Sequence, residues 1–196
     1  HQGSYGGTRE HKARLLIEII QAMRQAVGPD YPIWPCINAE EYGVENGITL
    51  METCQIVPMA VKAGAQAIHV SAYAAGSSVT KAPLSDTPGL LVPLAEAVKK
   101  VTSVPVIAVG RLDHEFGEKV LEEGKADAIA IGRRLLADPE LPNKVAQGRP
   151  DDVRPCIGCM ECIERVGPRE QGVICTINAA AGRERESQIQ PAPRNK

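Results

Sequence analysis

Patterns typical of buried strands and of amphipathic helices alternate along the first three quarters of this chain. Four short aliphatic runs, bounded by glycine, proline or polar residues, predict strands at 32–38, 67–72, 104–109 and 127–131. Helical periodicity and capping residues predict helices around them at 8–27, 49–63, 90–101, 113–124 and 138–147. Continuous aliphatic strands joined by helices are typical of parallel sheets. The pattern predicts an α/β protein, either a doubly wound sheet or part of a (βα)8 barrel.

The same dipeptide follows two successive predicted strands. Gly110-Arg111 comes after VIAV, and Gly132-Arg133 comes after AIAI. The carboxyl ends of parallel strands meet at one edge of a sheet, where ligands bind. Glycine lets a phosphate approach the backbone amides, and arginine supplies positive charge and a fork of donors. The repeat favours a phosphate site, although tight turns with arginine ion pairs would leave the same pattern.

Four cysteines follow the last predicted helix with the spacing C-x2-C-x2-C-x12-C: Cys156, Cys159, Cys162 and Cys175. Three closely spaced thiolates let one loop surround a polynuclear metal centre, and the fourth closes it from a later segment. Sulfur at every position selects soft metals, which means iron–sulfur or zinc. Because zinc sites more often pair two C-x2-C knuckles, the triplet favours a [4Fe-4S] cluster over zinc and over a disulfide framework.

Composition narrows the expected partners and compartment. The formal net charge of the 196 residues is −2 and the charges are well mixed, so we expect no nucleic-acid surface. The longest apolar run, 104–110, is too short to span a membrane, and the first residues lack the apolar region of a signal peptide. Six cysteines without secretory features favour a reducing compartment. We therefore expect a cytoplasmic protein without a nucleic-acid or membrane partner.

A few single residues outside these motifs are candidates for function. Tyr73, at the end of the second predicted strand, is a candidate catalytic residue, although a packing role fits it equally. Lys81 and Asp86 lie in the long Gly/Ser-rich loop that follows, where function commonly resides, and an exposed loop charge is the alternative for both. His69, inside the same strand, is expected to be a core group with its hydrogen bonds satisfied.

With these residues in view, the chain resembles the NADH:flavin oxidoreductases of the old yellow enzyme superfamily. Within it, the chain is most similar to the cluster-containing subgroup that includes trimethylamine dehydrogenase, 2,4-dienoyl-CoA reductase and 2-enoate reductase. The similarity lies in YGGTREHKARLLIEII, VPVIAVGRL, ADAIAIGRRLLADPELPNKV and RPCIGCMECIERVGPREQGVICTINAAAGRE. The cysteine spacing matches the trimethylamine dehydrogenase type more closely than that of the reductases.

The resemblance implies a fold and a domain arrangement. The fold would be a (βα)8 TIM-barrel fragment, about four C-terminal βα units, followed by a cysteine-rich iron–sulfur loop. Residues 1–148 would be the second half of the flavin-binding barrel, 149–183 the [4Fe-4S] segment and 184–196 a linker towards a Rossmann domain. The first four βα units, with the family's catalytic pair, would precede this sequence.

The resemblance also implies chemistry. Gly110, Arg111, Gly132 and Arg133 would hold the phosphate of FMN, and the four cysteines would hold iron. Electrons would pass between NAD(P)H or a substrate, FMN and the cluster, with FAD and NAD(P)H bound in a further part of the parent protein. The substrate would be a small molecule, namely an enone, an enoate or an amine.

The alternative class is non-enzymatic: a half-barrel that binds a cluster or zinc as a structural or electron-carrying module. In either case four βα units cannot close a barrel, so strand faces rich in Val, Ile and Ala would remain open. We therefore expect self-association or pairing with a complementary half-barrel.

One position departs from the family pattern. The fifth barrel strand of the family carries an arginine at the N1/O2 edge of the flavin, and PIWPCIN places Cys36 there. Without that cation, reduced flavin would be less stabilised, or another group would take over the role. From the residues alone, Cys36 and Cys54 are expected to be small buried apolar groups.

Overall fold

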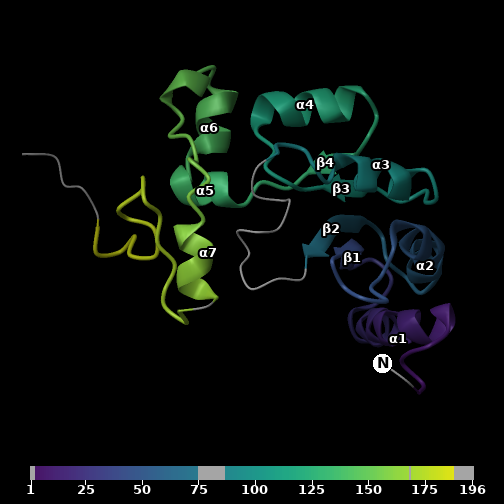
Figure 1. The fold of residues 1–196 in the computed structure, drawn as a ribbon. Coiled ribbons are helices and arrows are strands. Elements are labelled where there is room, and N and C mark those ends of the chain that lie inside the picture. Colours follow the sequence, from purple (N-terminus) through teal and green to yellow (C-terminus); the bar gives the residue numbers. More distant parts are fainter. Residues whose placement is uncertain (1–2, 75–86, 168, 188–196) are drawn as a thin grey trace, which may run out of the picture. The chain divides into compact units, whose positions relative to one another are not determined.

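Helices and strands alternate through the first 130 residues in the predicted order (Figure 1). The computed structural model describes residues 3–74, 87–167 and 169–187, and the chain divides into two compact units, His1–Ala130 and Ile131–Lys196. The elements of the first unit are α1 (Arg9–Val27), β1 (Cys36–Tyr42), α2 (Leu50–Lys62), β2 (Ile68–Ala74), α3 (Val92–Lys99), β3 (Val106–Ala108), α4 (His114–Glu122) and β4 (Ala128–Ile129).

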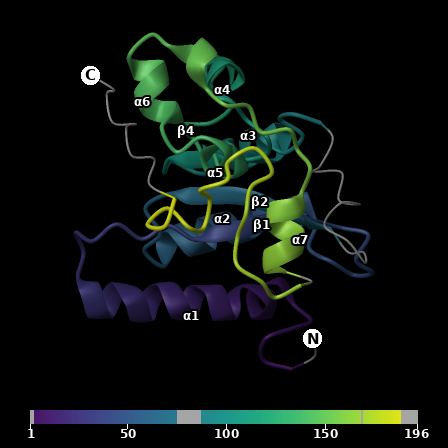
Figure 2. The same ribbon diagram turned by 90° about the vertical axis from the view of Figure 1, so that its left-hand side faces the viewer.

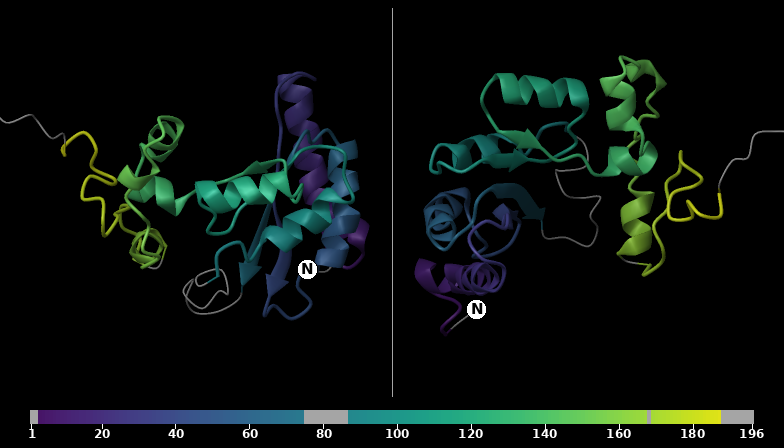
Figure 3. Two further views of the ribbon diagram at one scale, coloured as in Figure 1. Left: turned by 90° about the horizontal axis from the view of Figure 1, so that it is seen from above. Right: turned by 180° about the vertical axis from the view of Figure 1, so that it is seen from behind.

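The second unit is helical in its described residues and carries the cysteine segment. Its elements are α5 (Arg133–Ala137), α6 (Leu141–Ala146), the 3-10 turn η3 (Pro150–Asp152) and α7 (Glu161–Val166). Figure 3 shows these helices and the loop that follows α7. The domain boundaries predicted after residues 148 and 183 stay predictions. Among the described residues, no helix is long and apolar enough to cross a membrane.

The sheet of the first unit is parallel, with the strand order β1-β2-β3-β4. Ile68 pairs with Val106 and Val70 with Ala108, and all four side chains are completely buried. The helices α2, α3 and α4 pack on the strands, while α1 packs against α2 (Figure 2). The aliphatic core therefore lies between the sheet and its covering helices, as it does in a βα barrel.

The other face of the sheet is mixed rather than aliphatic. Cys36 pairs with His69, His69 with Ile107, and Ile107 with Ala128, so these residues form one row across the four strands. We expected open strand faces rich in Val, Ile and Ala. In this row Ile107 and Ala128 are of that kind, whereas Cys36 and His69 are not.

The helix starts follow the local capping chemistry that the sequence predicts. Thr8 accepts from the N–H of His11 at the start of α1. Thr49 and Glu52 form a reciprocal capping box at α2, and Asp113 accepts from the N–H of Phe116 at α4. Each side chain satisfies a backbone donor that the first turn leaves without an intrahelical partner.

Two predicted boundaries were wrong for physical reasons. β1 begins at Cys36 rather than at Pro32, because Pro32 and Pro35 have no N–H to donate to a strand ladder. Asp138 was predicted to cap the following helix, but it ends α5, and Glu140 is the N-cap residue of α6. The short helix α5 itself was not predicted.

Candidate metal centre

The four cysteines of the spaced motif surround one hollow in the second unit. Its empty volume is about 320 Å³ with the open mouth included. Besides the cysteines, its walls are formed by Arg133, Leu136, Ile157, Met160, Thr176 and Ile177. All six cysteines of the chain are free thiols. Cys156, Cys159 and Cys162 thus meet Cys175 at one place, although twelve residues separate Cys162 from Cys175 in the sequence.

The backbone between the first cysteines curls because two of its residues adopt left-handed conformations. Gly158 has φ 72° and Met160 has φ 62°. Glycine tolerates this region freely, whereas methionine is strained there by about 1 to 2 kcal/mol. Met160 is nevertheless 7% exposed and is the N-cap residue of α7, which carries Cys162. The turn directs successive cysteines of the motif into one hollow instead of along an extended strand.

Two of the thiols have shifted pKa values of opposite sign. A hydrogen bond with Thr176, 3.1 Å from the sulfur, and the backbone N–H of Glu161 lower the pKa of Cys159. Burial raises the pKa of Cys162, while the N–H of Ile163 and the charge of Arg133 act against that rise. The hollow therefore combines an apolar wall with groups that favour a thiolate.

The four cysteines form an all-sulfur donor set, which suits a soft metal centre. A tetrahedral zinc site draws its four sulfurs to about 2.3 Å from one point, whereas a four-iron cluster binds each thiolate at a separate corner. Within the described residues, no three His, Cys, Asp or Glu side chains converge on a single metal position. The choice between a cluster and zinc stays a prediction.

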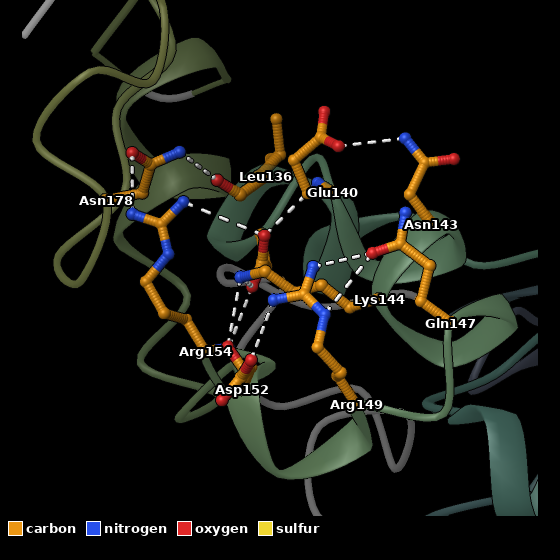
Figure 4. Close-up of polar contacts among 10 residues, drawn as sticks. Leu136, Glu140, Asn143, Lys144, Gln147, Arg149, Asp152, Arg154 and Asn178 are labelled. Atoms are coloured by element: carbon orange, nitrogen blue, oxygen red, sulfur yellow. Dashed lines mark hydrogen bonds and ion pairs between the residues drawn. The ribbon is translucent and has the colours of Figure 1, made fainter.

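A buried carboxylate, Asp138, lies at the centre of a polar network in the second unit. Figure 4 shows side chains of this network, among them Lys144, Arg154 and Asn178. The side chain of Asp138 is completely buried, and Oδ2 accepts from Lys144 Nζ at 2.6 Å and from the N–H of Arg154 at 2.9 Å. Oδ1 accepts from the N–H of Glu140 at 3.1 Å. Burial by itself would raise the pKa of Asp138, but these bonds outweigh burial and hold it below the usual value.

The same network reaches both flanks of the cysteine segment. Arg154, two residues before Cys156, donates from Nη1 to Asn178 Oδ1 at 3.3 Å. Asn178, three residues after Cys175 and 5% exposed, donates from Nδ2 to the carbonyl of Leu136 at 2.8 Å. Both ends of the segment are thereby attached to α5 and the turn that follows it. The sequence predicted none of these roles, because each contact joins residues that are far apart in the chain.

Gly110-Arg111, at the end of β3, has a constrained backbone. Gly110 has φ 123°, and a Cβ there would lie 3.2 Å from Leu91 Cγ. Its carbonyl accepts from the N–H of Gly89 at 2.8 Å. Arg111 has φ 54°, an uncommon value for a residue with a side chain. Such conformations concentrate at ligand sites, where the surrounding structure holds them in place.

Gly132-Arg133 lies in the second unit and has a different geometry. Gly132 precedes α5 with φ −106°, and a Cβ there would meet no atom within 4 Å among the described residues. Arg133 is half-buried, and its Nη1 donates to the Met160 sulfur at 2.6 Å. The two Gly-Arg pairs are described in separate units, so their predicted common phosphate site stays a prediction.

The remaining candidates have mixed outcomes. Tyr73 lies in β2 opposite Glu41. The structure describes the backbone of Tyr73, so its catalytic role stays a prediction. Cys36 is exposed, so the expectation of a buried thiol was wrong there. His69 Nε2 is buried and has no hydrogen-bond partner in the described part of the chain, which corrects the expectation of a satisfied core group. Lys81 and Asp86 lie outside the described residues.

Comparison with known proteins supports the relationship to the NADH:flavin oxidoreductases. The model of the NADH:flavin oxidoreductase / NADH oxidase family matches residues 2–152. An NADH oxidase of Thermoanaerobacter brockii is 44% identical over 96% of this chain, and a cinnamate reductase of Clostridium sporogenes is 34% identical over 96%. The solved structure of 6-hydroxypseudooxynicotine amine oxidase from Pseudomonas geniculata, 29% identical, matches 99% of this chain and 30% of its own with a TM-score of 0.86.

Parallel βα units that match such a structure over nearly their whole length define a partial TIM barrel. The chain belongs to the NADH:flavin oxidoreductase / NADH oxidase family. It spans about 30% of the length of the curated relatives that it matches.

Proposed function

We propose that this chain is the cofactor-bearing portion of a flavin- and iron–sulfur-dependent oxidoreductase. In this proposal the parent protein passes electrons between NAD(P)H or a substrate, FMN and a [4Fe-4S] cluster. The observation that carries the proposal is the hollow with four cysteines around it, in a chain of a flavin oxidoreductase family. When bound, FMN supplies hydride and electron chemistry, and the cluster supplies a one-electron relay.

The residues around the cysteine site have different roles in this proposal. Cys156, Cys159, Cys162 and Cys175 would hold the irons through their sulfurs. Leu136, Ile157 and Ile177 give the hollow an apolar wall. Thr176, close to the Cys159 sulfur, provides a hydroxyl that can donate to it. Hydrogen bonds to sulfur and limited solvent access are two of the levers that set the reduction potential of a cluster.

The flavin end of the proposal rests on the two Gly-Arg pairs. Gly132 leaves the backbone open to a phosphate, Gly110 allows the close turn against Leu91, and Arg111 and Arg133 would supply the positive charge that binds the phosphate. The constrained backbone at Arg111 and the absence of any described atom that a Cβ at Gly132 would meet both support a ligand role. For the substrate we propose an enone, an enoate or an amine, because a cinnamate reductase and an amine oxidase are among the similar proteins.

Anaerobic reconstitution of the chain with iron and sulfide tests the cysteine assignment. The chain should acquire broad visible absorbance, and Cys175→Ser should lose it because one corner of the cluster is left without its thiolate. Cys54→Ser is the matched control, since Cys54 lies on α2 outside the hollow, and it should keep the absorbance. Equal absorbance in the two variants would contradict the assignment, because Cys175 would then not be a ligand.

The phosphate assignment is tested by the affinity for FMN in a protein that contains a complete barrel. A charge-assisted bond is worth about 1.5 to 3 kcal/mol, so Arg111→Ala or Arg133→Ala should weaken FMN binding roughly tenfold or more. The matched control is Arg183→Ala, which removes the same charge from an exposed position of the second unit. Unchanged affinity in Arg111→Ala and Arg133→Ala would favour arginines that serve tight turns through ion pairs.

A further inference from the structure

Arg133 has an unusual partner for an arginine. Its Nη1 donates to the thioether sulfur of Met160, which is uncharged and a weak acceptor. Within the described residues, no carboxylate forms an ion pair with Arg133. The nearby Glu161 is paired with Arg169 at 2.6 Å. The charge of this half-buried guanidinium is therefore not neutralised by any acidic side chain of the described chain.

The position of that charge is informative. Arg133 forms part of the wall of the hollow, together with the four cysteines and Met160. Met160 lies in the sequence between Cys159 and Cys162, and its backbone is in the left-handed region. The hydrogen bond thus joins Arg133 to Met160, a residue of the cysteine loop with a strained backbone. A guanidinium has five N–H donors, so the contact with Met160 leaves others for the phosphate expected at Gly132-Arg133.

A cluster held by four thiolates carries net negative charge, and reduction adds one more electron. A fixed positive charge beside such a group stabilises the reduced state more than the oxidised state. We propose that Arg133 is the charge partner of the four-cysteine centre, oriented by Met160, and that it raises the reduction potential of the cluster. The inference rests on the proposed function, because it requires a cluster in the hollow.

The test is a potentiometric titration of the reconstituted chain, followed by the electron paramagnetic resonance of the reduced cluster. Arg133→Gln removes the charge and keeps a polar side chain of similar reach. The midpoint potential of Arg133→Gln should be lower by about 59 mV. For a one-electron couple this means that, at the wild-type midpoint potential, the ratio of reduced to oxidised cluster is about tenfold lower in the variant. Arg133→Lys should fall less, because it keeps the charge and loses the fork.

Two further variants separate charge from structure. Met160→Leu keeps the apolar volume and removes the sulfur, so its midpoint should shift in the same direction by a smaller amount. Arg183→Gln changes the net charge equally at an exposed position of the same unit and should keep the wild-type midpoint.

The outcomes distinguish the inference from the proposed function. A wild-type chain that takes up no iron and sulfide contradicts the proposed function. A loaded Arg133→Gln chain with the midpoint of Arg183→Gln overturns the inference and leaves the proposed function intact. Loss of the cluster from both Arg133→Gln and Arg133→Lys would also overturn it, because Arg133 would then be required for assembly rather than for the potential.

Discussion

At the scale of single residues, Asp138 is the group on which the second unit most depends. Asp138→Asn removes a buried charge that faces Lys144, whose side chain is 19% exposed, and two backbone N–H donors. We expect the free energy of unfolding at neutral pH to fall by about 2 kcal/mol. Urea denaturation measures this, and the exposed Asp151→Asn is the control that should leave stability nearly unchanged.

The contribution of Asp138 to the free energy of unfolding decreases at low pH. The pKa of Asp138 is lowered in the folded chain, relative to about 3.9 for an unfolded aspartate. Its stabilisation is therefore complete above the unfolded pKa and is lost as pH falls through the folded pKa. Wild type should lose more stability on acidification than Asp138→Asn does. Parallel acid profiles for the two proteins would contradict this account of Asp138.

His69 should give a pH dependence in a different range. Burial lowers the pKa of His69, so the unfolded chain binds a proton before the folded chain does. The free energy of unfolding should then decrease as pH falls through the unfolded pKa, about 6.5. His69→Gln should reduce that slope between neutral and mildly acidic pH, whereas His114→Gln should retain it. Thermal unfolding across this pH range measures the difference, and equal slopes would argue against a lowered pKa for the partly buried His69.

At the scale of elements, the two Gly-Arg turns should respond differently to the same substitution. Gly110→Ala forces a side chain into a backbone with φ 123° and against Leu91, which should cost about 1 to 3 kcal/mol. Gly132→Ala meets no described atom and should leave stability nearly unchanged. Denaturation of the two variants measures this contrast. Equal destabilisation would mean that Gly132 has a packing role, and its proposed phosphate role would lose its support.

The elements also show what local sequence can predict. Thr8, the Thr49–Glu52 box and Asp113 act within one helical turn of themselves, so the starts of α1, α2 and α4 were predicted to within about two residues. The cysteine spacing is equally local, and it predicted which thiols gather around one hollow. By contrast, Asp138 is bonded to Arg154 sixteen residues away, and its role depends on tertiary folding that no window of sequence contains.

At the scale of the whole molecule, one run of exposed apolar side chains in the described part of the chain lies on α1. Leu15, Ile19, Met23 and Val27 recur every four residues, and each is between 43% and 56% exposed. Residues four apart lie on one face of a helix, so the four form a continuous stripe. Scattered apolar residues on a surface are ordinary, whereas a contiguous stripe favours association.

We therefore expect the chain to self-associate or to pair with a complementary half-barrel through this stripe. Sedimentation of the chain should show a concentration-dependent increase in mass, and the double variant Leu15→Gln, Ile19→Gln should reduce it. Met51→Gln, which alters an exposed methionine outside the stripe, is the control and should sediment as wild type does. A compact wild-type monomer at all concentrations would contradict this expectation.

The most direct test of the account is the content of iron and acid-labile sulfide per chain after anaerobic reconstitution and desalting. The account predicts about four of each, because four thiolates around one hollow match the corners of a [4Fe-4S] cluster. One tightly bound zinc ion per chain with no acid-labile sulfide would contradict it.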